Sequence, residues 1–222
     1  MHLFGSRLLG ALILCALTAM VGAKRLATGS VLDERPDARL LVRVVNVFNL
    51  AFLLVVNPLA AILLVARRLE AWDVTHVEVQ PGWPLSVVEA VGTAGYLAGC
   101  GLMIWALLTL RRSYQLGGMA PRARDALVTG GPYALVRHPM YLAAVAMALG
   151  LALALQSWGC LAVFGAYVAL LGGLLPLEEA ALASAYGEPY RTYARAVPRL
   201  IPRLIRHAGE AQSNRSRHTA NS

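Results

Sequence analysis

Five long apolar runs constrain the fold of this chain more than any other feature of its sequence. They cover residues 8–23, 40–66, 87–110, 140–156 and 159–175. A helix that crosses a bilayer needs about 20 largely apolar residues, with a range of roughly 17 to 25. Only 14% of the residues are charged, whereas a soluble domain has about 25%. We therefore expect an all-α fold, a polytopic membrane helix bundle of about five transmembrane helices.

The chain is expected to form a single domain over residues 1–209. Residues 210–222 are rich in Ser, Asn, Arg and His, a composition that predicts a disordered tail. Within the domain, the Asn57-Pro58 pair predicts a kink in the second span, because proline removes a hydrogen bond from the helix ladder.

Prolines also predict how the C-terminal part is divided. Pro176 is expected to end the fifth span. A separate helical stretch over Leu177–Tyr186 would then end at Gly187, a residue type that often terminates helices. From Pro189 to Val197, tyrosines fall on one face and arginines on another. This pattern predicts an amphipathic helix that lies on the membrane surface.

The loops between the spans carry unequal shares of the positive charge. In a five-span bundle, 17 of the 20 lysines and arginines lie on one side and three on the other. Lysine and arginine concentrate in cytoplasmic loops. We therefore expect an integral protein of a bacterial inner membrane, with the N-terminus outside and the C-terminus inside. The first run could instead be a signal peptide cleaved near Val21-Gly22-Ala23, but cleavage would place two basic segments outside.

The composition also argues against two classes of partner. Aromatic residues are not interleaved with the basic ones as they are in nucleic-acid grooves, so no nucleic acid is expected. The three cysteines lie in three different apolar runs, and no pair has metal-binding or redox spacing. No metal site is expected.

The hairpin between the last two spans brings two polar segments together. The fourth span begins after Arg137-His138-Pro139, and the fifth ends before Glu178-Glu179, so both segments should meet at one membrane surface. The start of a helix favours an anion, and Arg137 adds a fixed positive charge there. Alternatively, Arg137 snorkels to lipid phosphates and His138 caps the helix, while the glutamates pair with Arg191 or Arg195.

S-adenosylmethionine is compatible with this arrangement, although spacing alone does not single it out. Its carboxylate suits the helix start with Arg137, and its ribose diol or its positive end suits Glu178 or Glu179. In the third span, Gly99 and Gly101 permit close approach of either a ligand or a neighbouring helix.

Motifs at these positions resemble a known superfamily of membrane methyltransferases. They are Leu127-Val128-Thr129-Gly130-Gly131-Pro132-Tyr133, Val136-Arg137-His138-Pro139-Met140-Tyr141, Glu178-Glu179, Tyr186-Gly187-Glu188-Pro189-Tyr190-Arg191-Thr192-Tyr193 and Val197-Pro198-Arg199-Leu200-Ile201-Pro202. Together they resemble the isoprenylcysteine carboxyl methyltransferase and phospholipid methyltransferase superfamily over about residues 95 to 203. The first two spans carry no such motif.

The resemblance implies a membrane-embedded methyltransferase that uses S-adenosylmethionine and acts on a lipid or small-molecule acceptor. The implied cofactor-binding residues are Gly99, Gly101, Tyr133, Arg137, His138, Tyr141, Glu178 and Glu179. For catalysis, Glu179 or His138 would deprotonate an amine or thiol acceptor, and Arg191 would orient a carboxylate acceptor.

Two other functions remain open at this stage. Membrane sterol reductases, which use a nicotinamide cofactor, share a similar arrangement of the Arg-His-Pro and tyrosine motifs. A non-enzymatic membrane protein could also retain the same motifs. Charged groups at membrane depth are costly unless they have a function, which favours an enzyme.

Overall fold

The computed structural model describes residues 6–28, 39–72, 75, 85–111 and 126–202, and these form helices without any strand. The tail expected to be disordered, residues 210–222, lies outside the described residues. The elements are α1 (Ser6–Thr28), α2 (Leu40–Ala51), the π-helical turn η1 (Phe52–Val56), α3 (Asn57–Val65), α4 (Leu69–Trp72), α5 (Leu85–Leu110), the 3-10 turn η3 (Gly131–Ala134), α6 (Pro139–Leu155), α7 (Trp158–Tyr186) and α8 (Glu188–Ala196).

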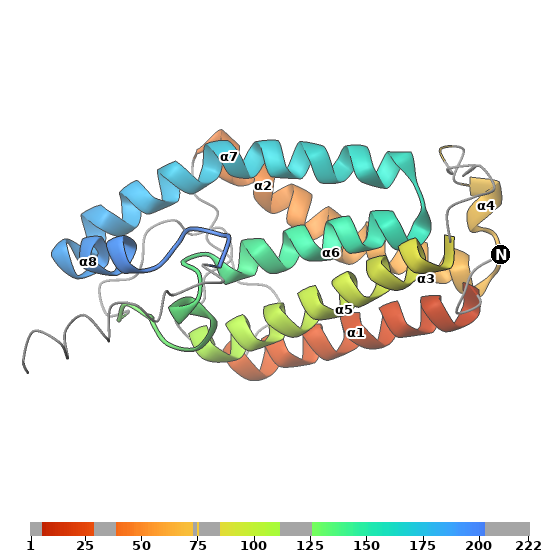
Figure 1. Ribbon diagram of the computed structural model, residues 1–222, viewed down its shortest axis with the longest axis horizontal. Coiled ribbons are helices and arrows are strands. Elements are labelled where there is room, and N and C mark those ends of the chain that lie inside the picture. Colours follow the sequence, from red (N-terminus) through yellow and green to blue (C-terminus); the bar gives the residue numbers. More distant parts are fainter. Residues whose placement is uncertain (1–5, 29–38, 73–74, 76–84, 112–125, 203–222) are drawn as a thin grey trace, which may run out of the picture.

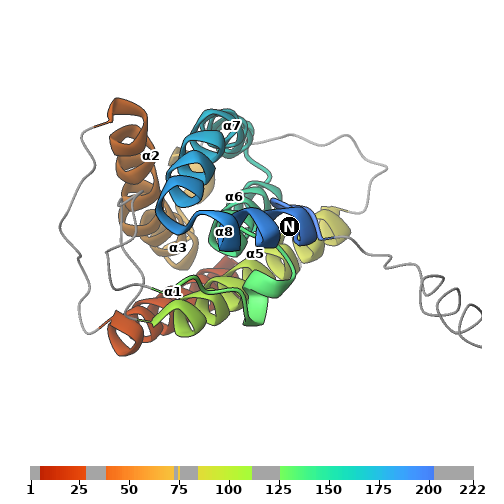
Figure 2. The ribbon, with the colours of Figure 1, turned by 90° about the vertical axis from the view of Figure 1, so that its left-hand side faces the viewer.

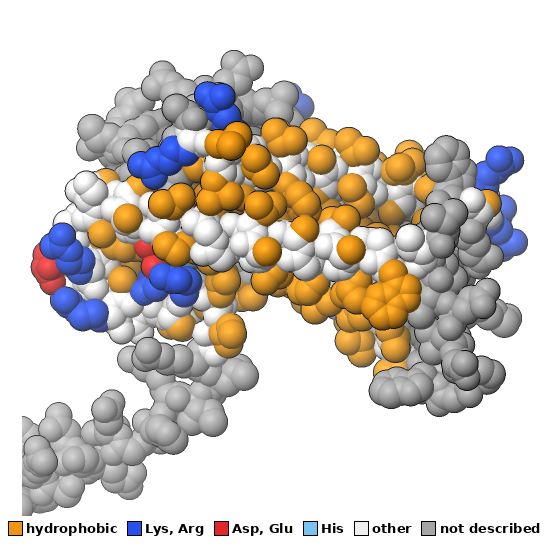
Figure 3. All heavy atoms as spheres, turned by 90° about the horizontal axis from the view of Figure 1, so that it is seen from above, with side chains coloured by type: hydrophobic (Ala, Val, Ile, Leu, Met, Phe, Trp, Pro, Cys, Tyr) orange, Lys and Arg blue, Asp and Glu red, His pale blue; other side chains and the backbone are white. Residues whose placement is uncertain are grey.

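The described part of the chain contains four helical stretches that are long and apolar enough to cross a membrane. They are α1, the continuous stretch Leu40–Val65 made of α2, η1 and α3, then α5, and α7. The fourth predicted span is α6, which is equally apolar but has 17 residues, the lower end of the spanning range. Apolar side chains cover the middle of the face shown in Figure 3, and lysines and arginines gather toward its ends. The expected all-α membrane bundle is confirmed.

Two apolar clusters hold the helices together. The first joins α1, α3, α5 and α6, and the second joins α2 with α7. Since α6 packs against both α5 and α7, it links the two clusters (Figure 1). The stretch from α2 to α3 runs from the second cluster to the first, because α2 packs on α7 whereas α3 packs on α1.

Glycines let α5 and α6 approach each other closely. A Cβ atom added at Gly92 would lie 2.4 Å from the backbone nitrogen of Ala154, and one added at Gly150 would lie 2.4 Å from that of Tyr96. Side chains at these positions would therefore force the two backbones apart. Small residues have the same function in many membrane helix pairs, where close backbone approach supplies van der Waals contact.

Buried polar groups accommodate Pro58 in the second span. The chain makes the π-helical turn η1 directly before Asn57, and the Asn57 side chain donates a hydrogen bond of 2.6 Å to the Phe52 carbonyl. The Tyr96 hydroxyl on α5 donates in turn to Asn57 Oδ1 at 2.7 Å. The chain thus departs from the α-helix in a π-helical turn directly before the predicted kink, and the Phe52 carbonyl accepts from both the backbone N–H and the side chain of Asn57.

Pro176 does not end the fifth span. The sequence predicted a helix end there, but α7 continues through Pro176 to Tyr186 and ends at Gly187, which has a φ of 63°. Proline removes one hydrogen bond, but Leu174 and Leu175 before it lie in the apolar cluster shared with α2, and Ala181 after it packs against the same cluster. As a consequence, α7 projects beyond the ends of α5 and α6, and α8 folds back beside it (Figure 1).

We expect the Asn57–Tyr96 hydrogen bond to couple the second span to α5. Asn57→Ala and Tyr96→Phe should each lower the unfolding temperature in detergent, because each leaves a buried polar group without its partner. The double variant should be more stable than the sum of the two losses predicts, with a coupling energy of about 0.5–1.5 kcal/mol. Strictly additive losses in thermal unfolding would show that this bond does not couple the two helices.

Candidate functional site

The carboxylate of Glu179 is the centre of a polar cluster at one end of the bundle. Its Oε1 lies 2.8 Å from a terminal nitrogen of Arg137 and 3.2 Å from Nε2 of His138. Arg199 approaches with Nε at 3.0 Å from Oε1 and with a terminal nitrogen at 2.5 Å from Oε2. Two guanidinium groups and one imidazole therefore converge on a single carboxylate.

Local sequence explains how α6 presents its part of the cluster. His138 precedes the first turn of α6 with non-helical angles, and Pro139 occupies that turn, where its missing N–H has no partner to lose. The His138 side chain is almost fully buried and makes no capping bond. It contacts Glu179 instead, and its Nδ1 lies 3.9 Å from Glu178. The alternative in which His138 only caps the helix is therefore wrong.

The segment after α8 closes the cluster from the other side. The backbone N–H of Arg137 donates to the Pro198 carbonyl at 2.8 Å, and that of His138 donates to the Arg199 carbonyl at 3.1 Å. α8 lies beside the projecting end of α7, and the segment that follows α8 returns to the start of α6 (Figure 1 and Figure 2). The chain therefore brings together residues about 60 positions apart in the sequence by backbone pairing as well as by charge.

Two tyrosines attach α8 to this end of the bundle. Tyr190 is buried, and its ring packs edge-on against that of Tyr193 at 6.1 Å between centroids. The Tyr193 hydroxyl donates to the Tyr133 carbonyl at 2.6 Å, which connects α8 to η3. Burial raises the pKa of Tyr193 to about 12, so this hydroxyl keeps its proton at neutral pH. Gly131, with a φ of 58°, forms the turn that places η3 against Thr109 of α5.

Most of the predicted site residues come together, whereas three do not. Arg137, His138, Glu178 and Glu179 form the cluster, the Tyr141 ring lies 5.8 Å from that of His138, and Tyr133 is tied to α8. The exceptions are Gly99, Gly101 and Arg191.

Each exception has a clear structural setting. A Cβ atom at Gly99 would lie 2.8 Å from the Ala143 carbonyl, so this glycine serves helix packing. Among the described residues, none comes within 4 Å of a Cβ atom built at Gly101. The Arg191 side chain is 59% exposed and lies 3.6 Å from Glu188 on the outer face of α8. Arg195 also pairs with Glu188, so neither arginine is the partner of Glu178 or Glu179.

Arg199, Tyr190 and Tyr193 belong to the site but were not predicted as site residues. Arg199 lies in the Val-Pro-Arg motif that contributed to the resemblance, and the two tyrosines share the apolar face of the predicted amphipathic helix. Their roles depend on how α8 and the following segment fold back, which sequence spacing does not specify.

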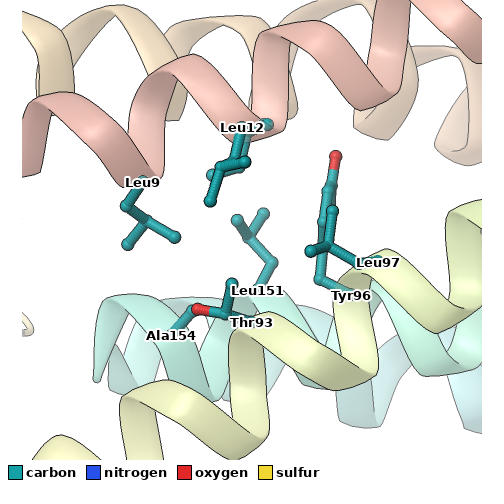
Figure 4. A pocket seen from close by; sticks show the side chains of 8 residues that line it. Leu9, Leu12, Thr93, Tyr96, Leu97, Leu151 and Ala154 are labelled. Carbon is teal, nitrogen blue, oxygen red and sulfur yellow. The ribbon is translucent and has the colours of Figure 1, made fainter. Parts of the chain in front are cut away.

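A separate apolar gap lies deeper in the bundle. Leu9 and Leu12 of α1, Thr93 and Tyr96 of α5, and Leu151 of α6 are among its lining residues (Figure 4). Leu151 is roughly 18 Å along α6 from the start of that helix at 1.5 Å per residue. The gap therefore belongs to the helix packing and is distinct from the polar cluster.

Within the described ranges, no group of three or more His, Cys, Asp or Glu could hold a metal ion.

A family of known proteins matches the segment that carries Arg137, His138, Glu178 and Glu179. Residues 87–189 match the family model of phospholipid methyltransferases. The cobalt-zinc-cadmium resistance protein CzcN of Cupriavidus metallidurans is 34% identical over 112 residues, which are 50% of this chain and 51% of that protein. The chain thus spans about half the length of this curated relative. All eight predicted cofactor-binding residues lie inside the matched segment, and Tyr190 and Arg199 lie beyond it.

Thermal stability distinguishes the structural roles of Gly99 and Gly101, the two glycines predicted to bind the cofactor. Gly99→Ala should lower the unfolding temperature in detergent, since its methyl group meets the α6 backbone and overpacking costs about 1–3 kcal/mol. Gly101→Ala should leave the unfolding temperature unchanged or raise it slightly, because alanine favours helix and its Cβ meets nothing. Equal thermal stability of the two variants would contradict the packing role assigned to Gly99.

Proposed function

We propose that this chain, whose residues 87–189 match the family model of phospholipid methyltransferases, is an integral membrane methyltransferase that uses S-adenosylmethionine. Its methyl acceptor is a lipophilic or small molecule. The observation that carries the proposal is the convergence of Arg137, His138 and Arg199 on Glu179 at one end of the bundle, within and next to the matched segment.

The residues of the cluster fit the charged groups of this cofactor. Arg137 is 13% exposed and keeps a buried Nε that has no hydrogen-bond partner among the described residues, which suits a carboxylate. Glu178 is 23% exposed, and among those residues its polar contact is the one at 3.9 Å to His138. Its carboxylate therefore suits an ammonium group or ribose hydroxyls. When bound, the cofactor supplies an activated methyl group on a sulfonium, which is a good leaving group.

The protein's contribution to the reaction is positioning and exclusion of water. Charge-assisted hydrogen bonds from Arg137 and Arg199 fix the Glu179 carboxylate, and the side chains of Arg137 and His138 are only 13% and 4% exposed. For an amine or thiol acceptor, His138 takes up the proton that the acceptor loses, because the ion pairs with Arg137 and Arg199 make the Glu179 carboxylate a weak base. A carboxylate acceptor needs no base. Arg191 is left out of this mechanism, because it pairs with Glu188 on the exposed face of α8.

The cluster is proposed to face the cytoplasm of a bacterial cell. Seventeen of the 20 lysines and arginines lie on its side of a five-span bundle, in agreement with the distribution of positive charge in membrane proteins. S-adenosylmethionine is available on that side. This orientation places the N-terminus outside and the C-terminus inside.

Titration calorimetry with detergent-purified protein tests the proposal. The chain should bind S-adenosylmethionine saturably, and Glu178→Gln should weaken binding by about tenfold or more, the effect of losing one hydrogen bond to a charged group. Glu188→Gln is the matched control, because Glu188 pairs with Arg191 and Arg195 outside the cluster. It should bind like the wild type.

The same titration with NADPH separates the alternatives. A folded wild type that binds NADPH and not S-adenosylmethionine would replace the proposal with a reductase. Binding of neither compound would indicate a non-enzymatic membrane protein.

A further inference from the structure

The guanidinium group of Arg137 has one nitrogen still available for a ligand. One terminal nitrogen donates to the Ala194 carbonyl of α8, and the other pairs with Glu179 at 2.8 Å on α7. The third nitrogen, Nε, is buried and has no hydrogen-bond partner among the described residues. Arg137 is thus held between α7 and α8 with one buried donor unused.

The hydroxyl of Tyr190 is a second unused donor in the same region. Tyr190 is 3% exposed, and its hydroxyl oxygen also lacks a hydrogen-bond partner in the described part of the chain. It lies one helical turn before Ala194, on the face of α8 to which Arg137 binds. Burial, together with the charge of Glu179, raises the pKa of Tyr190 to about 12 against the opposing effect of Arg137. The group is therefore a neutral hydroxyl that can donate.

Two buried donors without acceptors in one place require an explanation. Buried polar groups are almost always hydrogen-bonded, and an unpaired one is destabilising. Phenylalanine at position 190 would fill the same space without this penalty. The neighbouring Tyr193 shows that α8 can satisfy such a group, since its hydroxyl binds the Tyr133 carbonyl. A ligand group that only accepts hydrogen bonds would satisfy both donors.

We propose that the Tyr190 hydroxyl and the Arg137 Nε–H form one subsite that binds a carboxylate of the ligand between α7 and α8. The inference rests on the proposed function and names the residues that recognise the negative end of its ligand. Arg137 supplies the balancing charge, and Arg199, which is 46% exposed beside Glu179, adds a second positive charge next to the subsite. The carboxylate comes either from S-adenosylmethionine or from a carboxylate methyl acceptor.

The test compares Tyr190→Phe with Tyr193→Phe in the full chain. Without ligand, Tyr190→Phe should leave the unfolding temperature unchanged or raise it, because the hydroxyl makes no bond within the described protein. Tyr193→Phe should lower it, because the bond to Tyr133 is lost. For the ligand whose carboxylate occupies the subsite, Tyr190→Phe should raise the dissociation constant about tenfold or more.

Ligands that lack a free carboxylate show whether the cofactor or the methyl acceptor supplies the carboxylate that occupies the subsite. If the cofactor supplies it, decarboxylated S-adenosylmethionine should bind wild type and Tyr190→Phe equally. If the acceptor supplies it, cofactor affinity should not change in Tyr190→Phe. N-acetyl-S-farnesylcysteine should then bind the variant about tenfold more weakly, whereas its methyl ester should bind both proteins alike.

Two results would overturn the subsite while leaving the proposed function intact. One is wild-type affinity of Tyr190→Phe for both S-adenosylmethionine and N-acetyl-S-farnesylcysteine. The other is a loss of ligand-free stability in Tyr190→Phe as large as that in Tyr193→Phe, which would make the hydroxyl a structural group. If wild type binds neither ligand, the proposed function fails and the subsite fails with it.

Discussion

The carboxylate of Glu179 is the interaction on which the rest of the candidate site depends. It meets Arg137 and His138 from the start of α6 and Arg199 from the segment after α8. The partly buried Arg137 and His138 side chains would be destabilising without a negatively charged partner. One side chain on α7 therefore joins two segments that are about 60 positions apart in the sequence. The hydrogen bonds from the backbone of residues 137 and 138 to that of residues 198 and 199 complete the same junction.

The fold places this carboxylate through the length of α7. Because the helix continues beyond Pro176, Glu178 and Glu179 project past the end of the apolar core rather than lying in a loop. Gly187 then ends the helix with a positive φ, and the chain can reverse into α8. The two-residue connection between α6 and α7 puts the start of one helix and the extended end of the other at the same end of the bundle. Rigid helices thus carry the charged groups, which favours a fixed geometry over a flexible one.

Much of this arrangement could be predicted from the sequence, and the failures have physical causes. Apolar length predicts the helices, and the short hairpin predicts that Arg137-His138 and Glu178-Glu179 meet. The end predicted at Pro176 was wrong, because local propensity was overridden by packing against α2. A Cβ atom at Gly99 would lie 2.8 Å from the Ala143 carbonyl, so the helix packing that spacing left open is present there, and the cofactor role of Gly99 stays a prediction. Arg199 was not predicted as a partner of Glu179, because only the return of the chain after α8 brings it there.

Hydrogen–deuterium exchange of wild type and Glu179→Gln, in detergent and without ligand, tests most directly whether Glu179 holds the junction together. The variant keeps the size of the side chain and loses its charge. Without the Glu179 charge, exchange should be faster in peptides that contain Arg137 and His138, whose backbone N–H groups bind the Pro198 and Arg199 carbonyls, and in peptides from α8. Peptides from the α5–α6 contact around Gly92 and Gly150 should exchange as in wild type. Unchanged protection at residues 137 and 138 in the variant would show that the junction stands without the Glu179 charge, and would contradict the account.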